Sequence, residues 1–212
     1  MDAFDDLRTL LPTAGSAMLR GLRRDFLVLG AGATGVLAAG LLCAATLSEP
    51  DLAPVGLVMV PFLVLILGTG LVLAGLLSAR GGRVTFRTLL AGFLPPGQWL
   101  ANTTAALVIG LAVGAGLLLL IVPGLVLLGR LGFTFLYMNE GGMGLVGSLR
   151  ASWTLTAGRT GVLAGLTAAS VLLLVAGIAA GGVGAIPVLA GLVVVWGALF
   201  DLLREEQVRR AD

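Results

Sequence analysis

The chain has 212 residues, of which 58% are hydrophobic and 11% are charged, and its formal net charge is +2. A typical globular domain has roughly 25% charged residues, so a water-soluble fold would leave much of this apolar surface uncovered. We therefore expect lipid to surround the chain. The basic residues are spread along the sequence, which argues against the concentrated basic patch of a nucleic-acid-binding protein.

Six long apolar runs follow a mixed-charge N-terminal segment, 1–25. A transmembrane helix needs about 20 predominantly apolar residues to cross about 30 Å of hydrocarbon. Five of the runs have 20 to 24 residues and the fourth has 16. The runs lie at 26–47, 55–78, 100–122, 124–139, 161–180 and 183–203, and a short tail, 204–212, follows them. They predict an all-α integral membrane protein with a six-span membrane domain over 26–203.

The basic residues predict the orientation of these spans. All thirteen are arginines, and twelve lie in alternate gaps: before the first run, after the second, after the fourth and after the sixth. Segments rich in Lys and Arg are retained on the cytoplasmic side of a membrane. We therefore predict that both termini are cytoplasmic and that the spans pair into three hairpins, each preceded by a cytoplasmic segment. Anionic lipid headgroups are the expected partners of these arginines.

Two of the cytoplasmic segments have an apolar face at helical spacing. The first face consists of Phe86, Leu89, Leu90 and Phe93, and the second of Leu145, Val146, Leu149 and Trp153. A helix with one apolar face lies in the plane of the membrane interface, where Trp is enriched. We expect one interfacial amphipathic helix in each segment.

The dipeptide Pro123-Gly124 interrupts the apolar stretch 100–139. Without an interruption, this stretch would form a helix of about 60 Å at 1.5 Å per residue, about twice the hydrocarbon thickness. Proline breaks a helix interior, so we expect a tight turn between the third and fourth spans. A re-entrant hairpin is the alternative, and it would need protein or water around its backbone.

The side chains offer little catalytic chemistry. The chain has no histidine and no lysine, and its single cysteine is Cys43. These counts exclude an imidazole base, a His-ligated metal and a lysine Schiff base. A G-x-G-x-x-G pattern at 30–35 lacks the acidic residue at the end of a second strand that a dinucleotide site requires. We predict no enzymatic activity, no metal and no cofactor.

Arg130 is the one arginine inside an apolar run. An arginine near the bilayer centre costs between about 2.5 and 17 kcal/mol, depending on the scale, so its guanidinium needs partners. Thr134, Tyr137 and Glu140 follow at helical spacing and form a polar stripe that should face protein or water. The candidate partners are Asn102, Thr103, Asp201, Glu140 and the carbonyl groups freed at Pro123-Gly124. Together these residues form the predicted polar intramembrane cluster.

Three roles for Arg130 are open at this point. We favour a structural clamp that holds the short fourth helix in the bundle. The alternative is a site that binds a substrate or a lipid headgroup, and the third role is snorkelling of the side chain to the interface.

One part of the sequence resembles a known family. Its residues are Leu-Leu-Leu-Leu-Ile-Val-Pro-Gly-Leu at 117–125, Arg130, Phe133, Asn139-Glu140-Gly141 and Gly-Ser-Leu-Arg-Ala-Ser-Trp at 147–153. Over about 83–165 the chain resembles the uncharacterised YciC-like membrane proteins, which are similar to the membrane domain of some bacterial glycerophosphodiester phosphodiesterases. The resemblance implies a six-span protein of the prokaryotic plasma (inner) membrane. It implies no activity, because the phosphodiesterase domain has no counterpart here.

These observations lead to two functional hypotheses. We expect a non-enzymatic membrane scaffold or accessory subunit whose partners are membrane lipids and other membrane proteins, a second copy of the chain included. The alternative is a small transporter or lipid-handling protein in which Arg130 binds an anionic group.

Overall fold

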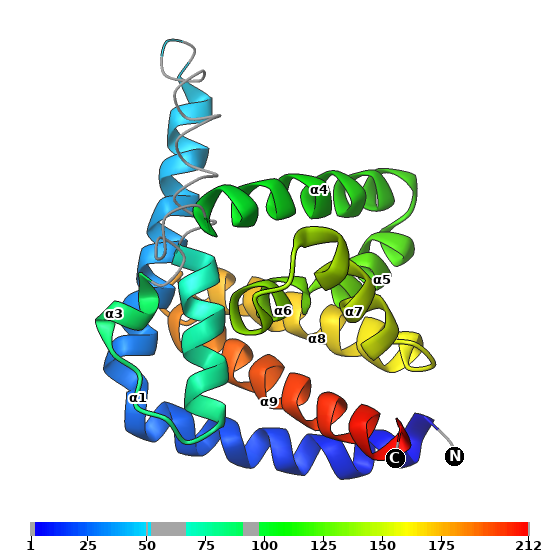
Figure 1. Ribbon diagram of the computed structural model, residues 1–212. Coiled ribbons are helices and arrows are strands. Elements are labelled where there is room, and N and C mark those ends of the chain that lie inside the picture. Colours follow the sequence, from blue (N-terminus) through cyan, green and yellow to red (C-terminus); the bar gives the residue numbers. More distant parts are fainter. Residues whose placement is uncertain (1–2, 50, 52–66, 91–97, 212) are drawn as a thin grey trace.

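The computed structural model describes residues 3–49, 51, 67–90 and 98–211, and within these ranges the chain is helical with no strand. The helices are α1 (Ala3–Ser48), the helix Leu67–Ala79, α3 (Phe86–Leu89), α4 (Gln98–Leu119), α5 (Ile121–Leu131), α6 (Thr134–Gly141), α7 (Leu145–Leu155), α8 (Thr160–Ala179) and α9 (Ala185–Ala211). In Figure 1 the second half of α1 stands upright, α4 lies across the top and α9 runs obliquely below. α4 packs on α5, α5 on α8, α8 on α9, and α9 on α1.

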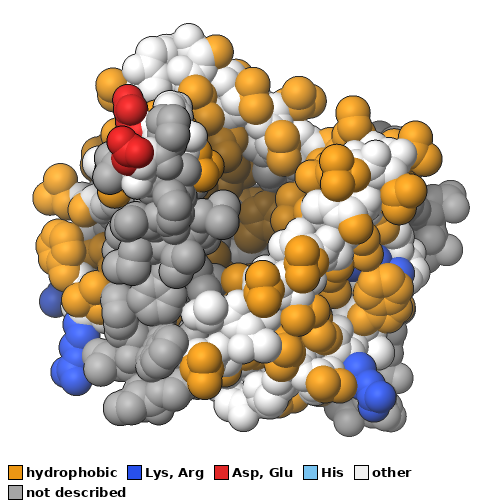
Figure 2. All heavy atoms as spheres, turned by 90° about the horizontal axis from the view of Figure 1, so that it is seen from above, with side chains coloured by type: hydrophobic (Ala, Val, Ile, Leu, Met, Phe, Trp, Pro, Cys, Tyr) orange, Lys and Arg blue, Asp and Glu red, His pale blue; other side chains and the backbone are white. Residues whose placement is uncertain are grey.

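Five helical segments are long and apolar enough to cross a bilayer. They are Met18–Ser48, Leu100–Leu119, Ile121–Gly141, Thr160–Ala179 and Ala185–Arg209. In order, they match the first, third, fourth, fifth and sixth predicted spans, so the predicted all-helical, multi-pass class is confirmed. The first half of the predicted second span, 55–78, lies outside the described residues, and its second half belongs to the helix Leu67–Ala79. The face in Figure 2 is mainly hydrophobic, as expected of a surface that contacts lipid.

α1 continues through the predicted start of the first span, with a kink at Asp25 (φ −113°, ψ 16°). Asp25 is only 7% exposed. Its carboxylate accepts hydrogen bonds from the Ser78 hydroxyl at 2.8 Å and from the Arg24 guanidinium at 3.4 Å, and Arg24 also donates to the Gly81 carbonyl at 2.5 Å. These contacts hold the kink against the end of the helix Leu67–Ala79. The predicted N-terminal segment is therefore a helix joined to the first span.

The predicted interruption of 100–139 is present, but it comes before Pro123-Gly124. The break is at Leu120, whose backbone is extended (φ −163°, ψ 144°). Pro123 is the third residue of α5, where its missing N–H costs little because the first helical turn has no intrahelical acceptor for it. Gly124 brings α5 close to α4: a Cβ there would lie 2.4 Å from the side chain of Leu117.

The predicted fourth span, 124–139, is not a single helix. α5 ends at Leu131 and α6 begins at Thr134, with Gly132 and Phe133 between them. Both intervening residues have backbone angles near the helical region, so the chain continues in the same general direction. α5 and α6 together form an apolar segment of 21 residues that is long enough to cross a bilayer. This length favours two full spans over a re-entrant hairpin.

The helix predicted in the second amphipathic segment forms as α7. Val146 and Trp153 on its predicted apolar face are exposed, whereas Ser148 and Ser152 on the opposite face are buried. Leu149 on the same predicted face is half-buried and packs against the core cluster that contains Leu131, so the predicted apolar face is only partly turned outward.

The prediction of an interfacial amphipathic helix in the first of these segments is wrong within the described residues. α3 is a single turn that ends at Leu89, and the expected face is divided because Phe86 is exposed while Leu89 is buried. A Cβ on Gly70 would lie 1.8 Å from the Leu89 carbonyl oxygen. The α3 backbone therefore packs directly on the helix Leu67–Ala79. Phe93 lies outside the described residues.

Glycines allow the helix Leu67–Ala79 and α9 to approach closely. A Cβ on Gly75 would lie 2.5 Å from the Val193 carbonyl oxygen, and a Cβ on Gly197 would lie 2.6 Å from the Cα of Leu76. Within lipid, helices associate through such packing because the lipid tails are as apolar as the side chains. This contact fixes the position of α9, which carries part of the site described below.

We expect Gly197→Leu to lower the free energy of unfolding by about 1–3 kcal/mol, because the added side chain overpacks the contact. Thermal unfolding in detergent, followed by circular dichroism, measures the effect. Gly110→Leu on α4 is the matched control, since a Cβ there meets no atom within 4 Å. Equal melting temperatures for the two variants would contradict the close helix contact.

Candidate functional site

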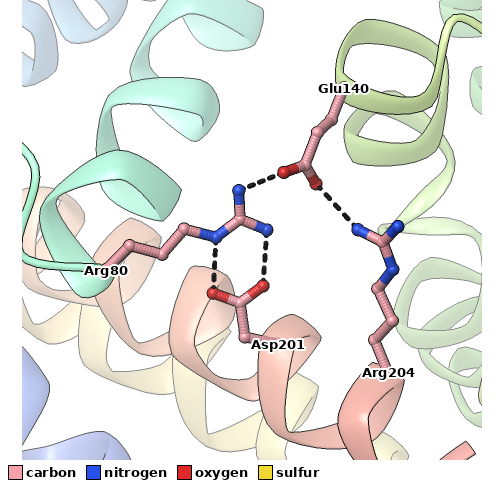
Figure 3. A network of polar contacts seen from close by, with 4 residues as sticks. All are labelled: Arg80, Glu140, Asp201 and Arg204. Atoms are coloured by element: carbon pink, nitrogen blue, oxygen red, sulfur yellow. Dashed lines mark hydrogen bonds and ion pairs between the residues drawn. The ribbon is translucent and has the colours of Figure 1, made fainter. Parts of the chain in front are cut away.

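Four charged side chains from three helices form one network (Figure 3). Arg80 follows the helix Leu67–Ala79 and donates to Asp201 on α9 through Nε at 2.8 Å and Nη2 at 2.6 Å. Its Nη1 donates to Glu140 near the end of α6. Arg204, one turn after Asp201, lies 3.5 Å from the other Glu140 oxygen. We call these four residues the Arg80 network.

The chemistry of the guanidinium explains this geometry. Its planar fork matches the two oxygens of one carboxylate, and its remaining N–H groups reach a second acceptor. The hydrogen bonds to Asp201 and Glu140 raise the pKa of Arg80 further above its ordinary value. Arg80 therefore stays cationic.

An open cavity of about 580 Å³ borders the network. Its described lining consists of Arg80, Asp201, Arg204, Glu205, Val208 and Arg209. The lining contains both positive and negative side chains, three arginines and two carboxylates. The cavity exposes the network to one side of the molecule.

Arg130 forms a second polar site, between α5 and α7. Its Nε donates to the Thr156 hydroxyl and its Nη2 to the Trp153 carbonyl, both at 3.3 Å. The guanidinium carbon lies 3.6 Å from the centre of the Trp153 ring, a cation–π distance. The Arg130 carbonyl, freed where α5 ends, accepts a hydrogen bond from the Ser152 hydroxyl at 2.6 Å. We call Arg130, Ser152, Trp153 and Thr156 the Arg130 clamp.

The two middle residues of the predicted polar stripe are buried in the core. Thr134 is fully buried, and its hydroxyl oxygen has no hydrogen-bond partner among the described residues. The Tyr137 ring packs edge-on against Phe200, with centroids 5.0 Å apart. Phe133, which precedes the stripe, contacts the same phenylalanine at 5.8 Å. This aromatic core separates Arg130 at one end of the stripe from Glu140 at the other.

The remaining predicted residues lie near α4. Asn102 is buried and exchanges two side-chain hydrogen bonds with Asn139, at 3.3 and 3.1 Å. Asn139 also donates to the Phe135 carbonyl at 2.8 Å. This amide pair joins α4 to α6, and Thr103 follows it on α4 in a half-buried position. The structure thus divides the predicted cluster: Glu140 and Asp201 meet at Arg80, Asn102 meets Asn139, and Arg130 contacts α7.

Sequence reasoning missed several residues of these sites. In the sequence, Arg80 and Arg204 were interpreted only as markers of orientation. Glu140 and Asp201 are carboxylates within the membrane domain, and they were the available signal that basic partners were needed. The hydroxyl residues Ser148, Ser152 and Thr156 recur at spacing four. That spacing places the three hydroxyls along one side of α7 and its C-cap, and this was the available signal for a partner of Arg130.

Comparison of the chain with protein-family models, with curated proteins and with solved structures found no match. The resemblance to the YciC-like proteins therefore stays a prediction. The length and composition of the helices define the class, a multi-pass membrane protein.

We expect Asp201→Asn to lower the free energy of unfolding by about 1–3 kcal/mol, because it leaves Arg80 without its bidentate partner. Thermal unfolding in detergent measures this loss. Glu205→Gln is the matched control: it removes the same charge from the exposed part of α9 beside the same cavity. If both variants unfold at the wild-type temperature, the network does not hold the helices together.

Proposed function

We propose that this protein is a non-enzymatic scaffold or accessory subunit of the prokaryotic plasma (inner) membrane, with both termini in the cytoplasm. The observation that carries the proposal is that the polar side chains bond to one another between helices. The Arg80 network joins three separate helices, and the Arg130 clamp joins α5 to α7. These side chains bind one another and thereby hold an irregular set of helices in a fixed arrangement.

The outward surfaces support an association role. Val146 and Trp153 on α7 are exposed, and large exposed apolar residues also follow α4 into the turn before α5. A rigid body with apolar outer faces presents packing surfaces to lipid and to neighbouring membrane proteins. Copies of the same chain are included among the proposed partners.

The second candidate is a transporter or lipid-handling protein in which Arg130 binds an anionic group. One observation favours it: Arg130 is only half-buried, and its described bonds use Nε and one of the two terminal nitrogens. A guanidinium has five N–H donors, so the Arg130 clamp leaves donor capacity for a phosphate.

Arg130→Gln separates the two candidates. For the scaffold we expect a lower melting temperature in detergent, unchanged recovery of anionic lipid from native membranes, and a protein partner that copurifies with wild type in a fixed ratio. For lipid handling we expect the reverse: loss of bound anionic lipid at an unchanged melting temperature. Arg150→Gln is the matched control, because Arg150 is exposed on α7 and carries the same charge. A wild-type preparation without any stoichiometric protein partner, from cross-linked native membranes, would contradict the scaffold role.

The proposed orientation has its own test. In a Cys43→Ala chain we expect Arg83→Cys to resist a membrane-impermeant thiol reagent in intact cells and to react in inverted vesicles. Asp51→Cys, after the end of α1, should show the opposite pattern. Both positions are exposed in the structure, so access is limited only by the membrane. Labelling of residue 83 in intact cells would overturn the orientation.

A further inference from the structure

An apolar, half-open pocket of about 260 Å³ lies between the helices, and its lining residues Leu128 and Val171 are exposed at its edge. Its walls come from the helix Leu67–Ala79, the α5–α6 segment, α8 and α9. Representative lining residues are Val72, Leu128, Leu136, Ser170, Leu192 and Trp196. Pockets between packed helices are common ligand sites, and nothing in the proposed scaffold role uses this one.

The pocket lies at the depth of the bilayer hydrocarbon. On α8 its lining falls within 167–174, in the middle part of the candidate span Thr160–Ala179. On α9 its lining falls within 189–196, in the apolar part of the candidate span Ala185–Arg209. At mid-span depth the surrounding medium consists of acyl chains and not of water.

The polar groups on the wall are already satisfied within the protein. The Trp196 indole N–H donates to the Ser170 hydroxyl at 3.2 Å, and that hydroxyl donates to the Leu166 carbonyl at 2.8 Å. The Thr167 hydroxyl donates to the Leu163 carbonyl at 2.8 Å. Among the described lining residues none is charged. A buried water needs two to four polar partners, so this wall favours an apolar occupant over water.

The interruption between α5 and α6 borders the same space. Gly132 and Phe133 lie between the two helices and both line the pocket. Gly132 has no side chain that could occupy the adjacent part of the pocket. An interrupted helix at membrane depth is tolerated where protein or a cavity surrounds it, and here the interruption and the cavity coincide.

We infer that this pocket holds one acyl chain of a bilayer phospholipid. Protein interiors are close-packed, and an empty space of this size deprives its lining of dispersion contacts. At about 30 Å³ for each water-sized group, the volume accommodates a chain segment of several methylene groups. The acyl chain moves from one apolar environment to another, so its retention in the pocket depends on how well the two shapes fit. The inference depends on the membrane location and is independent of the scaffold role.

Quenching of Trp196 by brominated acyl chains tests the inference. Trp99→Phe with Trp153→Phe leaves Trp196 as the only tryptophan. The protein is reconstituted into phosphatidylcholine vesicles with an increasing mole fraction of phosphatidylcholine brominated on its acyl chains. The reference is Leu172→Trp in a chain whose three native tryptophans are Phe, because Leu172 is exposed on α8 and reports bulk lipid. We expect Trp196 to reach half-maximal quenching at a mole fraction several-fold lower than the reference.

Variants that fill the pocket test whether the quenching depends on it. Val171→Phe, and independently Leu192→Phe, should shift the Trp196 curve to that of the surface reference, whereas Leu173→Phe on the exposed side of α8 should leave it unchanged. Circular dichroism confirms that each variant is folded. Coincident curves for Trp196 and the reference, absent quenching of Trp196, or a steep curve that survives both filling variants would each overturn the inference.

Discussion

The bidentate bond between Arg80 and Asp201 is the constraint on which the arrangement of the helices depends. Arg80 and Asp201 are 121 residues apart, and Glu140, which Arg80 also binds, is 60 residues away. In lipid, the hydrophobic effect does not favour the association of one apolar helix with another, because acyl chains are equally apolar. An ion pair that forms in only one geometry makes the association specific. The close glycine contacts between the helix Leu67–Ala79 and α9 then follow, because they occur just before the helix ends at Arg80.

The same principle explains the interruptions in the helices. Every break inside lipid frees backbone groups that water cannot satisfy. Where α5 ends, the Arg130 carbonyl is taken by Ser152. At the kink of α1, the Asp25 carboxylate accepts a hydrogen bond from the Ser78 hydroxyl. At two interruptions, therefore, a small hydroxyl residue from another segment bonds to a polar group beside the break.

Sequence reasoning predicted the class and the positions of the helices, because hydropathy and length are local properties. Its errors arose where tertiary contacts decide. Leu120 carries no sequence signal for a break, and Pro123 looked like the turn although it fits the first turn of the next helix. Gly132 is one of 33 glycines, so its role at an interruption could not be singled out. The membership of the polar cluster was predicted in part. Asp201 and Glu140 do share a partner, but that partner is Arg80, since pairing across a bundle depends on helix crossing and not on spacing along one helix.

The kinked α1 sets an order on the assembly of the protein. Its first half packs along α9, so these two helices, far apart in the sequence, cover one another. Until α9 is made, the part of α1 before Asp25 lacks this packing surface, and Arg80 has no Asp201. A ribosome-bound chain that stops before α9 can insert its earlier spans but cannot close the bundle. The contacts of α9 with α1 and with Arg80 therefore form only after the helices between them have been synthesised.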